Sequence, residues 1–288
     1  MDRSRPARPL SAIPVFYDDR MVANAHSFSP SAGKPCEVVN SWRRYDEALE
    51  FPRFDPASVE QLGRAHAESY VRNVLTGRIP NGFGNTLMEV ASALPWTSGA
   101  MLAAARAAIG NGAVAVAPVS GFHHACYAEG GGYCTFNGLM VTALALQAED
   151  KVRRVGILDY DMHYGNGTAQ ILRYLKPEGI AHYTAGQKYQ REDQAAEFIG
   201  SVPDQVRSFS DCDVLLYQAG ADPHIDDPLG GWLSSFQLAE RDRLVFRTCH
   251  ELGLPVAWNL AGGYQTPLRK VLDIHDATMR ACIATYLA

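Results

Sequence analysis

The stretch Val155-Gly156-Ile157-Leu158-Asp159-Tyr160-Asp161-Met162-His163 joins a short apolar run to a group of ionisable side chains. Similar apolar runs occupy residues 113–117, 214–217 and 256–260, and segments with apolar residues at helical spacing lie between them. Short apolar runs that alternate with helices are typical of a parallel sheet covered on both faces. The sequence therefore predicts an α/β fold, a three-layer doubly wound parallel sheet with helices on both faces.

The composition is that of a globular chain with a large core. Of 288 residues, 47% are hydrophobic and 20% are charged, and the formal net charge is −5. We find no internal repeat, low-complexity tract or long linker, so we expect a single domain over residues 1–288.

Charge and cysteine usage indicate which partners and which cellular compartment to expect. The acidic balance disfavours nucleic acid and anionic membranes as partners, and no apolar run approaches the roughly 20 residues that span a bilayer. The six cysteines are scattered, which indicates buried reduced thiols rather than a disulfide framework. With no secretory signal in the sequence, we expect a cytoplasmic protein, either a monomer or an oligomer.

Polar residues follow each of the four apolar runs. In doubly wound sheets, ligands bind beyond the carboxyl ends of the strands, where the connecting loops converge. The side chains expected there are His123 and His124 after the first run, Asp159, Asp161 and His163 after the second, Asp222 after the third, and Gly262, Gly263 and Tyr264 after the fourth. We expect the active site at this edge of the sheet.

Asp161, His163 and Asp222 form a candidate metal site. Asp161 and His163 are two residues apart in an extended segment, so their side chains point the same way and can reach one ion. An isolated pair of this kind is more often a surface or capping feature. Asp222, followed by Pro223, supplies a fixed third ligand. Three protein ligands leave one position for water, as in catalytic zinc sites, and two carboxylates also suit iron(II), cobalt or manganese.

Three further features of the sequence each allow a structural and a functional interpretation. The tandem His123 and His124 are either surface residues or, beside a metal, a general base and a general acid. Tyr264 is either an aromatic wall or a hydroxyl donor to the oxyanion of an attacked carbonyl, and the two glycines before it allow the backbone to bend around a ligand. Asp159 either caps the following turn or orients a histidine or binds a monovalent cation.

Several blocks, in the expected order over about residues 115–268, resemble the histone deacetylase superfamily. They are Gly121-Phe122-His123-His124-Ala125, Gly132-Tyr133-Cys134-Thr135-Phe136-Asn137, Asp159 to Thr168, Ala219-Gly220-Ala221-Asp222, Asp227-Pro228-Leu229-Gly230-Gly231 and Gly262-Gly263-Tyr264. Weaker similarity extends upstream to His66 and Tyr70. The resemblance implies the arginase/deacetylase fold and hydrolysis of an N-acetylated amine, such as acetyl-lysine or an acetylpolyamine, by a zinc-bound water.

The resemblance also implies a role for each matched residue. Asp161, His163 and Asp222 match the family's zinc ligands, His123 and His124 match its catalytic pair with the second as principal base, and Tyr264 matches its carbonyl-polarising tyrosine. Asp159 matches the partner of the first histidine and a ligand of a potassium site, to which Thr184 is also assigned. Gly132 and Tyr133 match positions that line the acyl-lysine tunnel, and Asn166 resembles the class II branch with its bacterial deacetylase-like amidohydrolases.

The chain departs from the family pattern in ways that concern the substrate. Leu229 stands where polyamine-specific relatives carry a gatekeeping glutamate, Tyr164 replaces a second histidine, and Ala221 replaces an aromatic residue. The segment 185–211 is shorter than expected and lacks family sequence, although relatives build one tunnel wall there. We therefore predict a wider cleft, unless Lys188, Tyr189 and Phe198 rebuild that wall.

Three functions remain open on the sequence alone. The first is a zinc-dependent deacetylase acting on an acetylated amine such as acetyl-lysine. The second is a deacetylase of a small acetylated amine, either a polyamine or an intermediate of secondary metabolism. The third is a catalytically silent acyl-amine binding protein, because a fold does not guarantee a function.

Overall fold

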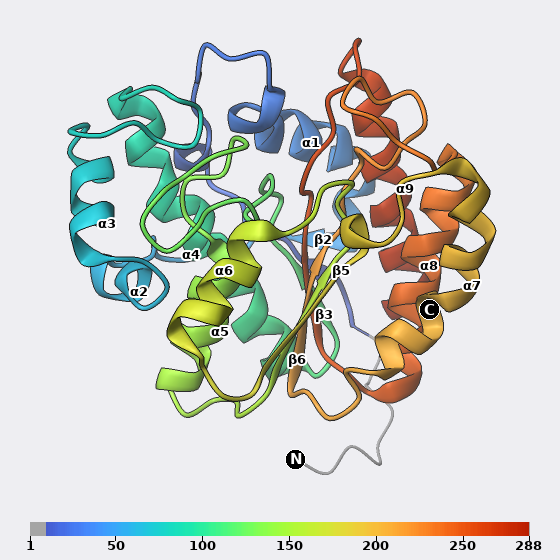
Figure 1. Cartoon of the computed structure of the whole chain (residues 1–288). Helices are drawn as coiled ribbons and strands as arrows, with labels where there is room; N and C mark the ends of the chain where they lie inside the picture. Colours follow the sequence, from blue (N-terminus) through green and yellow to red (C-terminus); the bar gives the residue numbers. More distant parts are fainter. Residues whose placement is uncertain (1–9, 288) are drawn as a thin grey trace.

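A computed structural model describes residues 10–287 of the chain. Its centre is a five-stranded parallel sheet with the strand order β3-β7-β6-β4-β5 (Figure 1). The strands are β3 Val114–Val116, β4 Val155–Asp159, β5 Ile180–Thr184, β6 Val214–Gln218 and β7 Val256–Asn259. A two-stranded parallel pair, β1 Ile13–Pro14 and β2 Leu49–Glu50, adjoins β3 through a bridge between Val15 and Val116.

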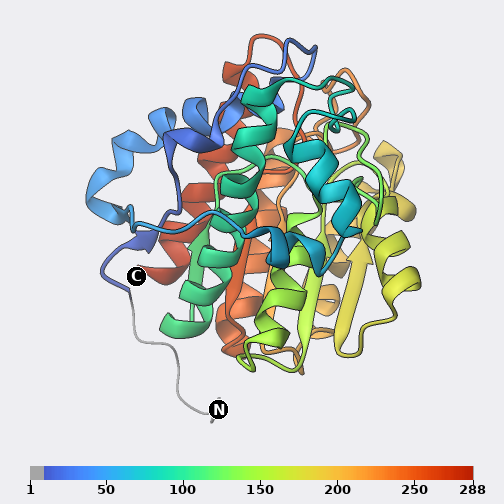
Figure 2. The same ribbon diagram turned by 90° about the vertical axis from the view of Figure 1, so that its left-hand side faces the viewer.

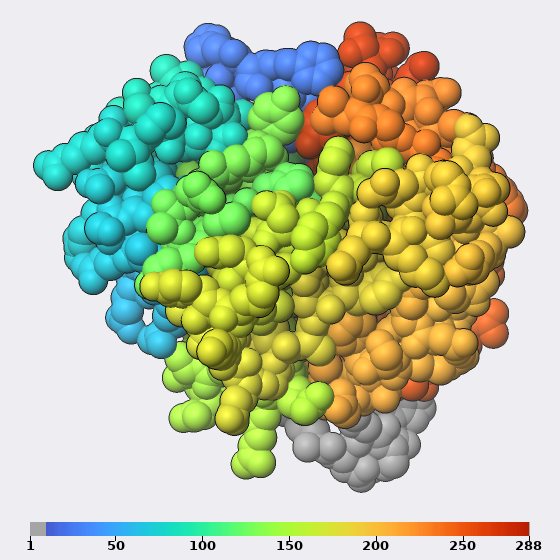
Figure 3. All heavy atoms as spheres, viewed as in Figure 1, coloured from blue at the N-terminus to red at the C-terminus, as the bar shows by residue number. Residues whose placement is uncertain are grey.

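Helices cover both faces of the sheet, which makes three layers. One face carries α2 Val59–Gly63, α3 Glu68–Leu75, α4 Met88–Asn111, α5 Gly138–Ala148 and α6 Asn166–Leu175. The other carries α1 Lys34–Trp42, α7 Ala195–Arg207, α8 Ser235–Leu252 and α9 Arg269–Tyr286. Figure 2 shows α4 and α5 side by side in front of the sheet, and in Figure 3 the gold segment containing α7 covers the right of the visible face.

Alternating residues of each strand enter two separate cores. Along β6, Leu215 and Tyr217 pack with α7 to α9, whereas Val214 and Leu216 pack with α4 and α5. Successive side chains of a strand point to opposite faces, so a strand buried on both sides is apolar throughout. This explains the continuous apolar runs and confirms the predicted fold class.

The order of the strands creates a switch point beside β4. From β4 the chain adds β5 on one side and then returns to place β6 on the other. The loops after β4 and β6 therefore leave in different directions and open a crevice between them. Asp161 lies in the first loop and Asp222 in the second.

Residues 56–75 carry apolar side chains at helical spacing, yet they form two short helices, α2 and α3, because the chain turns at residues 64–67. No helix within residues 10–287 combines the length and the apolar content that crossing a membrane requires.

Candidate metal centre and catalytic residues

Asp161, His163 and Asp222 converge at the switch point. One ligand atom from each residue can be chosen so that all three lie within 4.8 Å of one another. Nδ1 of His163 lies 3.1 Å from Oδ1 of Asp161 and 3.1 Å from Oδ2 of Asp222. The two carboxylates are buried and the imidazole is partly exposed. The structure thus brings together the three predicted ligands.

The electrostatics of this cluster fit a cation. Burial and the charge of Asp161 raise the pKa of the Asp222 carboxyl to about 7. Burial has the same effect on Asp161, but His123 and hydrogen bonds from His163 and Asp222 outweigh it and hold the pKa of Asp161 well below its usual range. Hydrogen bonds to both carboxylates raise the pKa of His163 to about 10. Two buried carboxylates side by side, with an imidazole, form a donor set suited to a divalent ion.

Glycines leave room around the two carboxylates. A Cβ at Gly262 would lie 2.3 Å from Oδ2 of Asp222 and 2.9 Å from Oδ2 of Asp161. The backbone N–H of Gly262 instead donates to Asp161 at 2.9 Å. The N–H of Met162 likewise donates to Asp222 at 3.2 Å. These backbone donors fix the orientation of both carboxylates.

The histidine pair lies against the metal cluster with two different partners. Nδ1 of His123 lies 2.7 Å from Oδ2 of Asp159, and its Nε2 lies 3.5 Å from Oδ1 of Asp161. Burial opposes the charged form of His123, but the charges of Asp159 and Asp161 prevail and raise its pKa to about 9. Nδ1 of His124 lies 2.5 Å from the amide oxygen of Asn166, and burial together with the charge of His123 lowers the pKa of His124.

Asp159 is fixed from several sides. Besides His123, it accepts hydrogen bonds from Nε2 of Gln218 at 2.9 Å and from the N–H of Asp161 at 3.2 Å. Asp159 therefore contacts the histidine directly, which corresponds to the second of its two sequence readings. Sequence reasoning missed Gln218, although a polar residue at the end of an apolar strand was a signal for it.

Thr184 pairs with Asp159 in the β4–β5 register and accepts a hydrogen bond from the N–H of Gly165 at 3.1 Å. The two residues assigned to a potassium site are thus strand neighbours.

Tyr264 lies in a buried loop whose conformation is held from two sides. Its backbone N–H donates to Oδ2 of Asp227 at 2.8 Å, and burial followed by the charge of Asp222 raises the pKa of its hydroxyl. Nζ of Lys34 donates to the carbonyls of Ala261 at 2.6 Å and Gly262 at 3.2 Å. Sequence reasoning missed Lys34, because nothing in its turn-rich surroundings indicates a contact more than two hundred residues away.

Two residues predicted to line the substrate passage, Gly132 and Tyr133, lie against His124 and Tyr264. Gly132 has a φ of +53°, and a Cβ there would lie 2.5 Å from Cδ2 of His124. The ring of Tyr133 lies 5.8 Å from the ring of Tyr264, centroid to centroid. Leu229 is exposed, 41% of its surface being accessible. Gly263 has a φ of +140°, a conformation that favours glycine.

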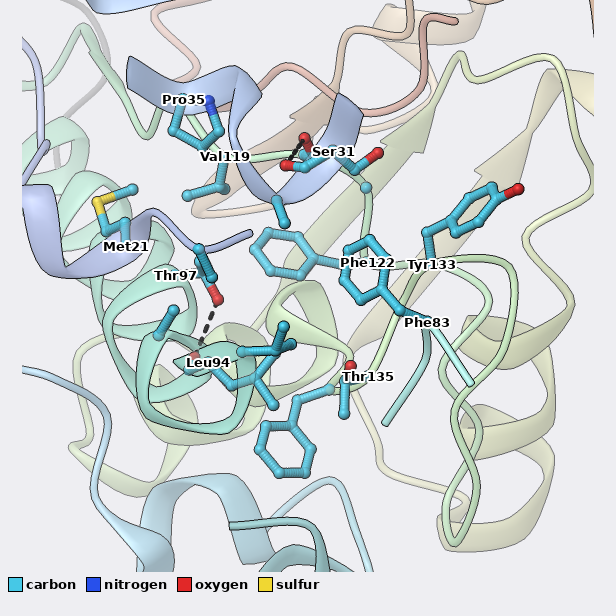
Figure 4. A pocket seen from close by; sticks show the side chains of 17 residues that line it. Met21, Ser31, Pro35, Phe83, Leu94, Thr97, Val119, Phe122, Tyr133 and Thr135 are labelled. Carbon is cyan, nitrogen blue, oxygen red and sulfur yellow. Dashed lines mark hydrogen bonds between the residues drawn. The ribbon is translucent and has the colours of Figure 1, made fainter. Parts of the chain in front are cut away.

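A largely apolar cavity lies behind Tyr133. Its volume is about 50 Å³, and Met21, Leu94, Val119 and Phe122 are among its lining residues. In Figure 4 the ring of Tyr133 stands at the edge of this cavity with its hydroxyl directed away from the other labelled side chains. Tyr133 thus borders the cavity and also lies beside the ring of Tyr264.

The segment 185–211 does not place aromatic rings at the mouth of the site. Tyr189 and Phe198 are fully buried, and both pack against Trp232. Lys188 pairs with Glu197 at 2.8 Å. A solvent-open groove beside Tyr164 is lined by His182, Thr184 and Gln187, among others. The alternative in which these residues rebuild a tunnel wall is therefore not what the structure shows.

A family model described as the histone deacetylase domain matches residues 34–183, slightly more than half of the chain. The chain belongs to the histone deacetylase family. This confirms the resemblance read from the sequence blocks.

Individual relatives agree with this assignment. Histone deacetylase 2 of Arabidopsis thaliana is 25% identical over an alignment of 321 positions, gaps included, which covers 96% of this chain and 81% of that protein. An uncharacterized protein of Picosynechococcus sp. is 26% identical over 220 residues, which cover 67% of this chain and 73% of that one.

Solved structures share the fold. The HDA15 HD domain aligns with a TM-score of 0.78 and 18% identity, covering 97% of this chain and 90% of that domain. An acetylpolyamine aminohydrolase from Burkholderia pseudomallei aligns with a TM-score of 0.72 and 18% identity, covering 94% of this chain and 98% of the enzyme.

Proposed function

We propose that this deacetylase-family chain is a zinc-dependent amidohydrolase that removes an acetyl or related acyl group from an amine such as acetyl-lysine. The observation that carries the proposal is the convergence of Asp161, His163 and Asp222 beside the histidine pair, with Tyr264 near enough that, besides burial, the charge of Asp222 raises the pKa of its hydroxyl. We extend the proposal to one catalytic domain over residues 1–288.

The three residues would hold the ion through two carboxylates and one imidazole. When bound, zinc lowers the pKa of a water and polarises the acyl carbonyl. Asp159 and Thr184 would in addition hold the potassium ion that the family resemblance implies.

His124 is suited to act as the base. The amide oxygen of Asn166 accepts from its Nδ1, which leaves Nε2 free to take a proton from the attacking water. Its lowered pKa keeps this imidazole neutral near neutral pH. His123 differs, because Asp159 favours its charged form, and it can supply a proton when the amine leaves.

Tyr264 is suited to stabilise the oxyanion. Because its pKa is raised, the hydroxyl stays protonated and can donate to the carbonyl oxygen as negative charge develops there. Water adds to the carbonyl carbon, the C–N bond breaks, and the amine departs with one proton. Gly132, Tyr133, Leu229, Gly262 and Gly263 would border the acyl group and the amine chain.

One experiment tests the proposal directly. Purified protein loaded with zinc is incubated with an acetyl-lysine peptide, acetylated polyamines and N-acetyl metabolites, and acetate release is measured. We expect turnover of at least one substrate, loss of turnover with a chelator, and recovery when zinc is restored. Zinc-loaded protein that binds these amines and releases no acetate would support the silent binding protein instead.

A small acetylated amine is the second candidate substrate class. The buried positions of Tyr189 and Phe198 favour it, because neither ring is available to enclose an extended lysine stem. The substrate screen ranks the two classes.

A further inference from the structure

Arg241 contacts both loops that carry the metal-binding carboxylates. It lies on α8 and is fully buried. Its Nη1 donates to the carbonyl oxygen of Gly220 at 2.8 Å and to that of Tyr160 at 3.2 Å. Tyr160 directly precedes Asp161, and Gly220 lies two residues before Asp222. One nitrogen therefore bridges the chain just after β4 and just after β6.

The guanidinium is itself held in place. Its Nε donates to Oδ1 of Asp242 at 2.8 Å. Asp242 also accepts hydrogen bonds from the hydroxyl of Tyr217 on β6 and, at 2.6 Å, from Thr278 on α9. The bridge is thus anchored to the sheet and to a second helix, so Arg241 cannot shift without disturbing this network.

The two loops are in close contact where Arg241 joins them. A Cβ on Gly220 would lie 2.7 Å from Cα of Asp161 and 2.7 Å from Oδ1 of Asp222. Because the loops leave no room for a side chain at Gly220, a change in the distance between the carbonyls of Tyr160 and Gly220 must move the two carboxylates relative to each other. Metal sites tolerate about 0.5 Å of such displacement.

Arg241 also has a hydrogen-bond donor that neither its ion pair with Asp242 nor its two carbonyl contacts use. Among the described residues, its Nη2 is buried without a hydrogen-bond partner. Burial of an arginine with an unused donor costs stability.

We propose that Arg241 is a positioning residue for the metal centre, which fixes the separation of the Asp161 and Asp222 carboxylates by bridging the carbonyls of Tyr160 and Gly220. The inference rests on the proposed metal-dependent function. Lysine cannot replace arginine here, because its single nitrogen cannot pair with Asp242 and reach both carbonyls at once.

The test measures zinc affinity rather than activity alone. Metal-free wild type, Arg241→Lys and Asp242→Asn are titrated with zinc against a chelator of known affinity. We expect Arg241→Lys to bind zinc about 10- to 100-fold more weakly than wild type. Asp242→Asn keeps the bridging arginine but loosens its anchor, so we expect a smaller loss in the same direction. Arg247→Met, which removes an exposed pair with Glu251 on the same helix, should leave zinc affinity unchanged.

Further readouts separate positioning from simple destabilisation. At saturating zinc, the kcat of Arg241→Lys should return to within a few-fold of wild type. Wild-type zinc affinity in folded Arg241→Lys would overturn the inference. If Arg241→Lys does not fold, unchanged zinc affinity in Asp242→Asn overturns it instead. Wild type that binds no zinc would contradict the proposed function itself, which is a different result.

Discussion

Nδ1 of His124 lies 2.5 Å from the amide oxygen of Asn166, whereas Nδ1 of the neighbouring His123 faces a carboxylate. The two imidazoles therefore have different proton affinities although their ring centroids are only 4.1 Å apart. This difference suits one residue to accept a proton and the other to give one. A general acid and a general base act together when their surroundings push their pKa values apart.

Asn166→Asp tests this arrangement. A carboxylate beside Nδ1 favours the imidazolium and raises the pKa of His124, so the base stays protonated up to a higher pH. We expect the acidic limb of the kcat/KM profile to move to higher pH by about one unit. The profile is measured from pH 5 to 10 with saturating zinc. An acidic limb that stays in place would show that His124 is not the group titrating there.

Asp222→Ala should empty the metal site. The variant removes one of two buried carboxylates and leaves two ligands, too few for a tightly bound catalytic zinc ion. Zinc content is measured after dialysis, with Asp226→Ala, an exposed residue of the same loop, as the control. We expect about one zinc ion per chain in the control and none in Asp222→Ala. Full zinc loading of Asp222→Ala would refute the ligand assignment.

Tyr264→Phe should keep the metal and lose turnover. The substitution removes only the hydroxyl group. Loss of one oxyanion donor reduces kcat by about 10²–10³-fold. Single-turnover kinetics and zinc content are measured together, with the exposed Tyr174→Phe as the matched control. Wild-type turnover in Tyr264→Phe would exclude the oxyanion role.

Lys34 should make stability depend on pH. Burial lowers its pKa to about 8, although Asp222, Asp161 and Asp227 oppose this. The unfolded chain releases the same proton near pH 10.4, so between these values the unfolded state binds more protons and the free energy of unfolding rises with pH.

Comparison with Lys34→Met isolates this contribution. The stability of wild type relative to the variant should increase by about 2–3 kcal/mol from pH 8 to 10, since each pKa unit corresponds to 1.36 kcal/mol. Urea unfolding at several pH values measures it, with the exposed Lys151→Met as control. A difference between wild type and Lys34→Met that does not vary with pH would contradict the prediction.

The strands that carry the site were predictable from the sequence, whereas the edge strand β5 was not. β4 and β6 are buried on both faces, so Val155–Asp159 and Val214–Gln218 contain long apolar runs. β5 lies at the edge of the sheet, most of its residues are only partly buried, and Ile180–Thr184 includes a histidine, a tyrosine and a threonine. A strand of this kind has neither a continuous apolar run nor a clear alternation.

The same contrast applies to the site. Asp161, His163 and Asp222 follow apolar strands and could be found by their position at strand ends. Lys34 and Arg241 lie on helices that are far from the site in sequence, and they contact its loops through backbone carbonyls. A carbonyl acceptor leaves no signature in the amino-acid sequence, so these two residues become visible only in three dimensions.

The burial of the aromatic rings of the segment 185–211 predicts a preference among acylated amines. Tyr189 and Phe198 are buried against Trp232, so neither ring is available to enclose an extended lysine stem. Each methylene left in water forgoes about 0.8 kcal/mol, and two such groups weaken binding by about tenfold. We therefore expect a high KM for an acetyl-lysine peptide and tolerance of butyryl or trifluoroacetyl groups and of short acetylated amines.

The measurement is kcat/KM for four substrates that share the amide bond: an acetyl-lysine peptide, the matching butyryl and trifluoroacetyl peptides, and a short acetylated amine. Gln187→Trp adds a bulky ring next to Gly186, whose backbone packs against His163, and should lower KM for the peptide because the ring can cover part of the lysine stem. Glu192→Trp, at an exposed position of the same segment, is the control. A strong wild-type preference for the acetyl-lysine peptide over the short amine would rule out the open cleft, since only an enclosed stem could supply that selectivity.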